Sequence, residues 1–216
     1  MRDEEIFTGE MRSFFTWMFL FFMGVMTVHR FWETLFRIER ERGEVEKGWT
    51  MYVLGIVHTL VGIIAIIEYF WLKRRLNYYV TLTGLILFTV AFLGKRWAVK
   101  TLGKYHSVQI EIREDQPLIK NGPYKYVRHP IYLCVIFELL GFPLIPNSYY
   151  AFLIALFGYV PVLLVRLFLE EKALFKKFGE EYIEYKKRVP CIIPLLKKGR
   201  ILINSSLLKR VPIEDR

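Results

Sequence analysis

The chain has 216 residues, of which 54% are hydrophobic, and it carries a formal net charge of +10 at pH 7. Long apolar runs exclude an ordinary soluble domain and predict an all-α integral membrane protein. The positive charge is concentrated beside these runs, which disfavours nucleic acid as a partner and favours an anionic membrane surface. The two cysteines and four histidines show neither disulfide-framework nor metal-ligand spacing, so we expect no metal site.

Five apolar runs predict about five transmembrane helices. They cover residues 13–28, 50–72, 77–94, 131–145 and 149–165. A basic turn, Lys73-Arg74-Arg75, joins the second run to the third and indicates an antiparallel hairpin. The fourth run barely crosses a hydrocarbon core of about 30 Å, so we expect it to form a tight hairpin with the fifth.

The remaining segments divide the chain into three expected parts. These are the N-terminal membrane helices (1–94), a core of loop, helical hairpin and C-terminal helix (95–196), and a basic tail (197–216). In the first part, apolar spacing over 30–47 predicts an amphipathic helix on the membrane surface. In the core, a polar loop covers 95–130 and includes an extended piece at 107–113. The amphipathic helix at 166–188 continues the fifth run and is weakened or divided at Gly179.

Charge predicts the orientation of the chain in the membrane. The loop 95–130 has 8 basic and 3 acidic residues, and residues 166–216 have 13 and 7. Positive segments prefer the cytoplasmic side, so we expect this loop and the C-terminus there. Five spans then put the acidic N-terminus outside, together with the basic turn at 73–75, which runs against the same tendency.

A dense polar cluster lies where the long loop meets the fourth run. Residues 121–132 read N-G-P-Y-K-Y-V-R-H-P-I-Y, and Pro130 fits the first turn of a helix. Arg128 and His129 therefore lie at a helix N-terminus, where free N–H groups can meet a carboxylate or phosphate. Three tyrosines surround them: Tyr124, Tyr126 and Tyr132. The cluster is either such a site or an interface belt of Tyr and Arg.

Charged residues follow the fifth run at helical spacing. Arg166 and Glu170 are four residues apart and share a helix face, with Glu171 beside them. The structural interpretation is an interfacial salt bridge. The functional one has a carboxylate binding an ammonium group and an arginine positioning an anionic substrate group.

Three further residues are weaker candidates. Glu138 lies in the middle of the fourth run, and an ionisable group inside a span is a functional candidate by default. Tyr182 and Tyr185 belong to a stripe that is better explained by helix packing than by ligand contact.

Four segments of the sequence form a combined pattern: L-G-K-Y-H-S-V (102–108), G-P-Y-K-Y-V-R-H-P-I-Y (122–132), R-x-x-x-E-E (166–171) and F-G-E-E-Y-I-E-Y-K-K-R-V-P (178–190). Together they resemble the isoprenylcysteine carboxyl methyltransferase family. The combination is specific, although R-H-P-x-Y also occurs in phospholipid N-methyltransferases and sterol reductases. Two departures are visible: Cys134 stands where many members have glycine, and eukaryotic members have more spans before the motif.

The resemblance implies S-adenosylmethionine as methyl donor, in a cytosolic pocket built from the loop 95–130, the start of the fourth run and the C-terminal helix. Gly122, Tyr124, His129 and Tyr132 would surround it. Glu170 and Glu171 would bind its ammonium group, and His129 or Tyr132 its carboxylate. His106, Ser107 and Val108 would line the adenosine side. Arg166 would lie near the transferred methyl group and the substrate carboxylate.

The expected function is methylation of a prenylcysteine carboxylate, or a similar lipophilic acceptor that enters from the bilayer. A phospholipid amine is the alternative acceptor. It would need a general base, for which Glu138 or Glu171 could serve, whereas a carboxylate needs none. Two other classes remain open, a sterol-type reductase using NADPH and a non-catalytic membrane scaffold.

Overall fold

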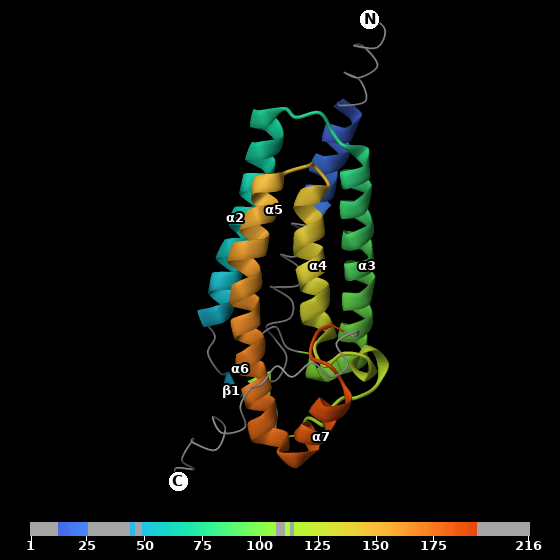
Figure 1. Cartoon of the computed structure of the whole chain (residues 1–216), viewed down its shortest axis with the longest axis vertical. Helices are drawn as coiled ribbons and strands as arrows, with labels where there is room; N and C mark the ends of the chain where they lie inside the picture. Colours follow the sequence, from blue (N-terminus) through green and yellow to red (C-terminus); the bar gives the residue numbers. More distant parts are fainter. Residues whose placement is uncertain (1–12, 26–43, 46–48, 107–110, 113–114, 194–216) are drawn as a thin grey trace, which may run out of the picture.

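The computed structural model describes residues 13–25, 44–45, 49–106, 111–112 and 115–193. Apolar helices lie side by side with their axes nearly parallel, and the short helix α7 (Glu180–Arg188) lies at one end of the bundle (Figure 1). We call this end the site end and the opposite one the distal end. The expected tail at 197–216 lies outside the described residues.

Three helices are long and apolar enough to cross a membrane, at Tyr52–Leu72, Tyr78–Tyr105 and Tyr149–Phe178. Two shorter apolar helices, Ser13–Val25 and Pro130–Leu144, lie among them. The prediction of a multi-pass, helical membrane protein is therefore confirmed, whereas five complete spans stay a prediction.

Helices α2 (Trp49–Leu72) and α3 (Tyr78–Leu102) form the expected hairpin. At the distal end, the side chain of Asn77 caps α3 by accepting hydrogen bonds from the N–H groups of Tyr79 and Val80. The expectation that a loop begins at Lys95 is wrong. Helix α3 continues because Lys95–Leu102 has few helix-breaking residues and buries Ala98, and it ends only at Gly103, with φ of 56°.

Helix α4 (Pro130–Leu144) crosses α3 at two glycines. A Cβ atom on Gly84 would lie 2.8 Å from the carbonyl oxygen of Gly141, and one on Gly141 would lie 2.9 Å from that of Gly84. Small residues allow two helices in a membrane to approach this closely.

The fifth apolar run is one continuous helical rod. It consists of α5 (Tyr149–Ile154), a π-helical turn (Ala155–Tyr159) and α6 (Val160–Phe178). The carboxylate of Glu68 on α2 fixes its beginning by accepting hydrogen bonds from the N–H groups of Tyr149, Tyr150 and Ala151. The rod ends at Gly179, with φ of 51°, and α7 (Glu180–Arg188) follows. The predicted division at Gly179 is confirmed.

Short elements join the helices at the site end. Strands β1 (Glu44–Val45) and β2 (Glu111–Ile112) pair antiparallel, with Glu44 opposite Ile112. The expected extended piece at 107–113 is therefore confirmed at its described residues. The amphipathic helix expected at 30–47 falls mostly outside the described residues, and at 44–45 it is wrong, because pairing with β2 holds this segment extended. Two 3-10 turns, at Gly103–Tyr105 and Gly122–Lys125, complete the connection.

Candidate functional site

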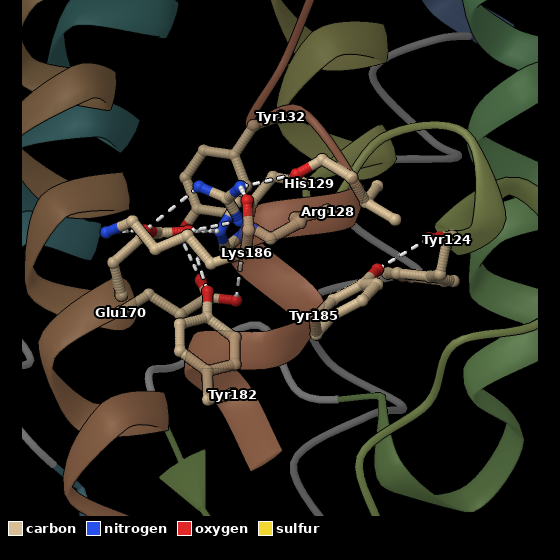
Figure 2. A network of polar contacts seen from close by, with 10 residues as sticks. Tyr124, Arg128, His129, Tyr132, Glu170, Tyr182, Tyr185 and Lys186 are labelled. Atoms are coloured by element: carbon tan, nitrogen blue, oxygen red, sulfur yellow. Dashed lines mark hydrogen bonds and ion pairs between the residues drawn. The ribbon is translucent and has the colours of Figure 1, made fainter. Parts of the chain in front are cut away.

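Glu171 on α6 is the centre of a buried polar network at the site end. Figure 2 labels its partners Arg128, His129, Tyr182 and Lys186. Its carboxylate accepts hydrogen bonds from Nε and Nη2 of Arg128 at 2.9 and 3.1 Å. It also accepts one from the hydroxyl of Tyr182 at 2.6 Å, and Nζ of Lys186 lies 3.0 Å away. Nε2 of His129 completes the set at 2.9 Å. This carboxylate is already satisfied by protein groups.

Arg128 also fastens the chain that follows α7. Its Nη1 donates to the carbonyl oxygen of Val189 at 2.6 Å, and its N–H donates to that of Pro190. The N–H of His129 donates to the carbonyl of Cys191. These two backbone N–H groups, expected from the sequence to meet an anion, therefore bind the C-terminal segment.

His129 lies between the two neighbouring glutamates. Burial by itself lowers its pKa, but the hydrogen bonds and charges of Glu170 and Glu171 outweigh burial and raise the pKa to about 9. The imidazole is therefore positively charged at neutral pH. Burial, reinforced by the charge of Glu171, raises the pKa of Tyr182, which keeps its hydroxyl protonated as a donor.

Glu170 differs from Glu171 in exposure and in partners. Its carboxylate accepts a hydrogen bond from the hydroxyl of Tyr132 at 2.5 Å, and Nδ1 of His129 lies 3.7 Å away. Its side chain is 30% exposed, whereas that of Glu171 is 7% exposed. Glu170 is therefore the carboxylate of the pair that a ligand can reach.

Arg166 lies one helical turn before Glu170 and is buried. Its Nη1 donates to the hydroxyl of Thr50, at the start of α2, with a distance of 2.8 Å. It also interacts electrostatically with Tyr132 and Glu170. The structure thus brings the expected residues Arg166, Glu170 and Tyr132 together.

Glu138, expected as a candidate catalytic residue, faces α3 instead. It is buried, and its carboxylate lies 3.3 Å from Nζ of Lys95. Its neighbour one turn earlier, Cys134, packs against Gly94 of α3, where an added Cβ would lie 2.9 Å from the cysteine sulfur. The Glu138–Lys95 ion pair and the Cys134–Gly94 contact join α4 to α3. These contacts of Glu138 give no support to the expected catalytic role.

The expected residues of the long loop have different positions. Tyr124 is buried, and its carbonyl accepts a hydrogen bond from the hydroxyl of Tyr185 at 2.5 Å, which joins the loop to α7 (Figure 2). Tyr126 is exposed, and His106 is half-buried after the first 3-10 turn. Gly122 has φ of 56° and packs against Thr101. Ser107 and Val108 lie outside the described residues.

Sequence reasoning missed two residues of this site. Lys186 carries a signal, because it follows Tyr182 by four residues on α7 and so shares its face. Thr50 carries none, since 116 residues separate it from Arg166.

Among the described residues, three side chains of types that bind metal ions lie close together. Ligand atoms of His129, Glu171 and Cys191 lie within 4.8 Å of one another. Arg128 and Lys186 already neutralise the same carboxylate, however, so we assign no metal to this group.

The sequence of residues 82–176 matches the isoprenylcysteine carboxyl methyltransferase (ICMT) family. Over 137 residues the chain is 31% identical to the uncharacterized protein YpbQ of Bacillus subtilis, covering 62% of this chain and 80% of that protein. It is 31% identical to the protein-S-isoprenylcysteine O-methyltransferase of Saccharomyces cerevisiae, with coverage of 54% and 49%. For the Homo sapiens enzyme the identity is 29%, with coverage of 61% and 47%. The chain thus spans about half the length of these two methyltransferases.

A solved structure of the eukaryotic intramembrane Ras methyltransferase ICMT has a similar fold, with a TM-score of 0.53 at 21% identity. The alignment covers 72% of this chain and 56% of that one. The family match includes Arg128, His129, Arg166, Glu170 and Glu171 and ends before α7. Sequence and fold agree, and the chain belongs to the isoprenylcysteine carboxyl methyltransferase family.

Proposed function

We propose that the protein is a membrane-embedded, S-adenosylmethionine-dependent methyltransferase that acts on the carboxylate of a prenylcysteine or a similar lipophilic acceptor. Membership of the family supports the reaction class. The observation that carries the site is the pairing, one helical turn apart on α6, of the accessible carboxylate of Glu170 with the buried guanidinium of Arg166. One group suits an ammonium and the other a carboxylate.

The charges of the network fit the cofactor. Glu170 would bind its ammonium group, because Glu171 is occupied by Arg128, His129, Tyr182 and Lys186. The positive charge of His129 suits its carboxylate end. We therefore assign the two glutamates different roles: Glu170 contacts the cofactor, and Glu171 holds the walls of the pocket in position.

The candidate bases favour a carboxylate acceptor over an amine. An amine must lose a proton as it is methylated, whereas a carboxylate is already ionised. Both bases considered from the sequence are engaged, Glu138 with Lys95 and Glu171 with its donors. An acceptor that needs no base fits these contacts better.

The main task of the protein in this reaction would be to align the acceptor carboxylate with the methyl group. S-adenosylmethionine would supply a methyl group on a sulfonium. The acceptor carboxylate oxygen would bond to the methyl carbon as the carbon–sulfur bond breaks, so the neutral thioether would leave and no proton would move. Arg166 would hold the acceptor carboxylate in line. Burial of Arg166 and Tyr132 keeps water away, and a step in which opposite charges cancel is favoured in such surroundings.

We place the site end on the cytoplasmic side. Basic residues of α3, of the 3-10 turn that follows it and of α6 gather there, among them Lys100, Lys104, Lys176 and Lys177. At the distal end, Arg74 lies 3.7 Å from Glu68, so part of the opposing charge is paired. The polar cofactor would then arrive from the cytosol and the lipophilic acceptor from the bilayer.

Calorimetry of the detergent-purified protein with S-adenosylhomocysteine tests the cofactor, with NADPH as the parallel titrant. We expect saturable binding of S-adenosylhomocysteine that is lost in Glu170→Ala and retained in Glu184→Gln, whose residue lies in an exposed pair with Arg188. Binding of NADPH alone would favour a reductase. Binding of neither by folded protein would favour a scaffold.

A further inference from the structure

Thr50 connects the N-terminal part of the chain to the site. It lies in the first turn of α2, is 0% exposed, and accepts the hydrogen bond from Nη1 of Arg166. Helices α2 and α6 lie side by side at this end of the bundle (Figure 1). The residue also lies outside the segment that matches the family, which begins at residue 82.

A buried guanidinium needs a fixed partner to act as a selective binding group. Arginine carries five N–H donors in a rigid fork, and a buried donor without an acceptor is costly. Its long side chain also has many rotamers, so a hydrogen bond from a rigid element limits where the fork points. The hydroxyl of Thr50 supplies such a contact from a different helix.

Thr50 and Glu170 both act on Arg166, from two different helices. Glu170 attracts the guanidinium along α6, one turn away, and Thr50 binds Nη1 from α2. Without Thr50, the fork of Arg166 is expected to leave the orientation that this hydrogen bond fixes. The contact therefore sets the direction of the cation from outside the helix that carries it.

We propose that Thr50 is a positioning residue for the methyl acceptor: it holds Arg166 in the orientation that binds the acceptor carboxylate. This inference rests on the proposed function and adds to it a contribution from the N-terminal helices. It predicts that the Thr50 hydroxyl controls selectivity for a charged acceptor and has little influence on cofactor affinity.

Two substitutions separate the hydroxyl from the shape of the side chain. Thr50→Val keeps the branched shape and removes the oxygen, whereas Thr50→Ser keeps the oxygen. Thr59→Val is the matched control, because it makes the same change on the same helix, where the Thr59 hydroxyl donates to the carbonyl of Gly55.

The test compares N-acetyl-S-farnesylcysteine with its carboxamide. We measure methyl transfer to the acid, inhibition by acid and amide, and calorimetric affinity for S-adenosylhomocysteine. In Thr50→Val we expect kcat/KM for the acid to fall by about tenfold or more, with the preference for acid over amide reduced by a similar factor. Cofactor affinity should stay within about twofold of wild type, and Thr50→Ser and Thr59→Val should behave like wild type.

A general structural defect would weaken acid and amide equally and would also lower cofactor affinity, and that result overturns the inference. So does an unchanged preference in Thr50→Val, which would leave the proposed function standing. A folded wild-type protein that binds S-adenosylhomocysteine but neither methylates nor binds the acid would instead contradict the proposed acceptor.

Discussion

Glu170 and Glu171 are neighbours in sequence, yet their side chains differ in direction, in partners and in exposure. Successive residues of an α-helix point about 100° apart, so the two carboxylates leave α6 in different directions. Glu171 points into the network that joins Arg128 to α7. Glu170 points toward Tyr132 and keeps part of its surface open.

Removing the charge of Glu170 should therefore affect mainly cofactor binding, whereas removing that of Glu171 should affect mainly stability. We expect Glu170→Gln to weaken binding of S-adenosylhomocysteine by about 10- to 100-fold, through the loss of one charge-assisted hydrogen bond, and to lower stability less than Glu171→Gln does. Glu171→Gln leaves Arg128 and Lys186 without their carboxylate and should lower the free energy of unfolding by about 3–5 kcal/mol.

Calorimetry and thermal unfolding in detergent measure the two effects, and Glu184→Gln serves as the surface control. Equal loss of binding in both variants, with equal stability, would contradict the division of roles.

The raised pKa of His129 makes stability depend on pH. Because the folded state holds this proton more tightly than the unfolded chain, the stabilisation is fully present below about pH 6.5 and is lost as pH rises through about 9. We expect the thermal midpoint to fall over this range in wild type and less so in His129→Asn. Parallel curves for the two proteins would refute the assignment.

At the scale of the elements, α3 and α4 approach each other closely at Gly84 and Gly141. An alanine methyl at Gly84 would lie 2.8 Å from backbone atoms of Gly141 and Ile145, and backbone cannot move aside cheaply. We expect Gly84→Ala to destabilise the protein by about 1–3 kcal/mol.

Gly62→Ala is the matched control, since an added Cβ at Gly62 on α2 meets nothing within 4 Å. That change should be neutral, or stabilising by up to about 1 kcal/mol through helix propensity. Thermal unfolding of both variants measures this difference in stability. Equal stability would mean that the helices do not cross at these glycines.

Hydropathy and turn residues predicted most elements, because a membrane span depends on local composition. The beginning of α4 at Pro130 and the division at Gly179 follow from local backbone rules. The continuation of α3 past Lys95 was missed, because helix propensity persists where hydropathy falls.

The site was partly predictable for a related reason. Motif spacing identified Arg166, Glu170 and His129, which lie in short segments. It could not show that Glu138 binds Lys95 or that Arg166 binds Thr50, because these partners are set by how helices distant in sequence face each other.

For the whole molecule, we predict that the site end faces the cytoplasm. We expect Arg75→Cys, at the exposed distal turn, to react with a membrane-impermeant maleimide added outside intact cells. Lys177→Cys, near the end of α6, should react only after the membrane is permeabilised. A background in which Cys134 and Cys191 are replaced by serine controls for the natural thiols. The reverse labelling pattern would show that the site end faces outward and would contradict the predicted orientation.

Methyl transfer to an acceptor carboxylate forms a methyl ester, and this bond can be detected in the product. Purified protein is incubated with methyl-labelled S-adenosylmethionine and N-acetyl-S-farnesylcysteine, and the product is treated with base. We predict label that base releases as volatile methanol, as a methyl ester requires, and its loss in Arg166→Ala. Label that enters a phospholipid amine and resists base, or no transfer by folded protein that binds S-adenosylhomocysteine, would contradict the claim.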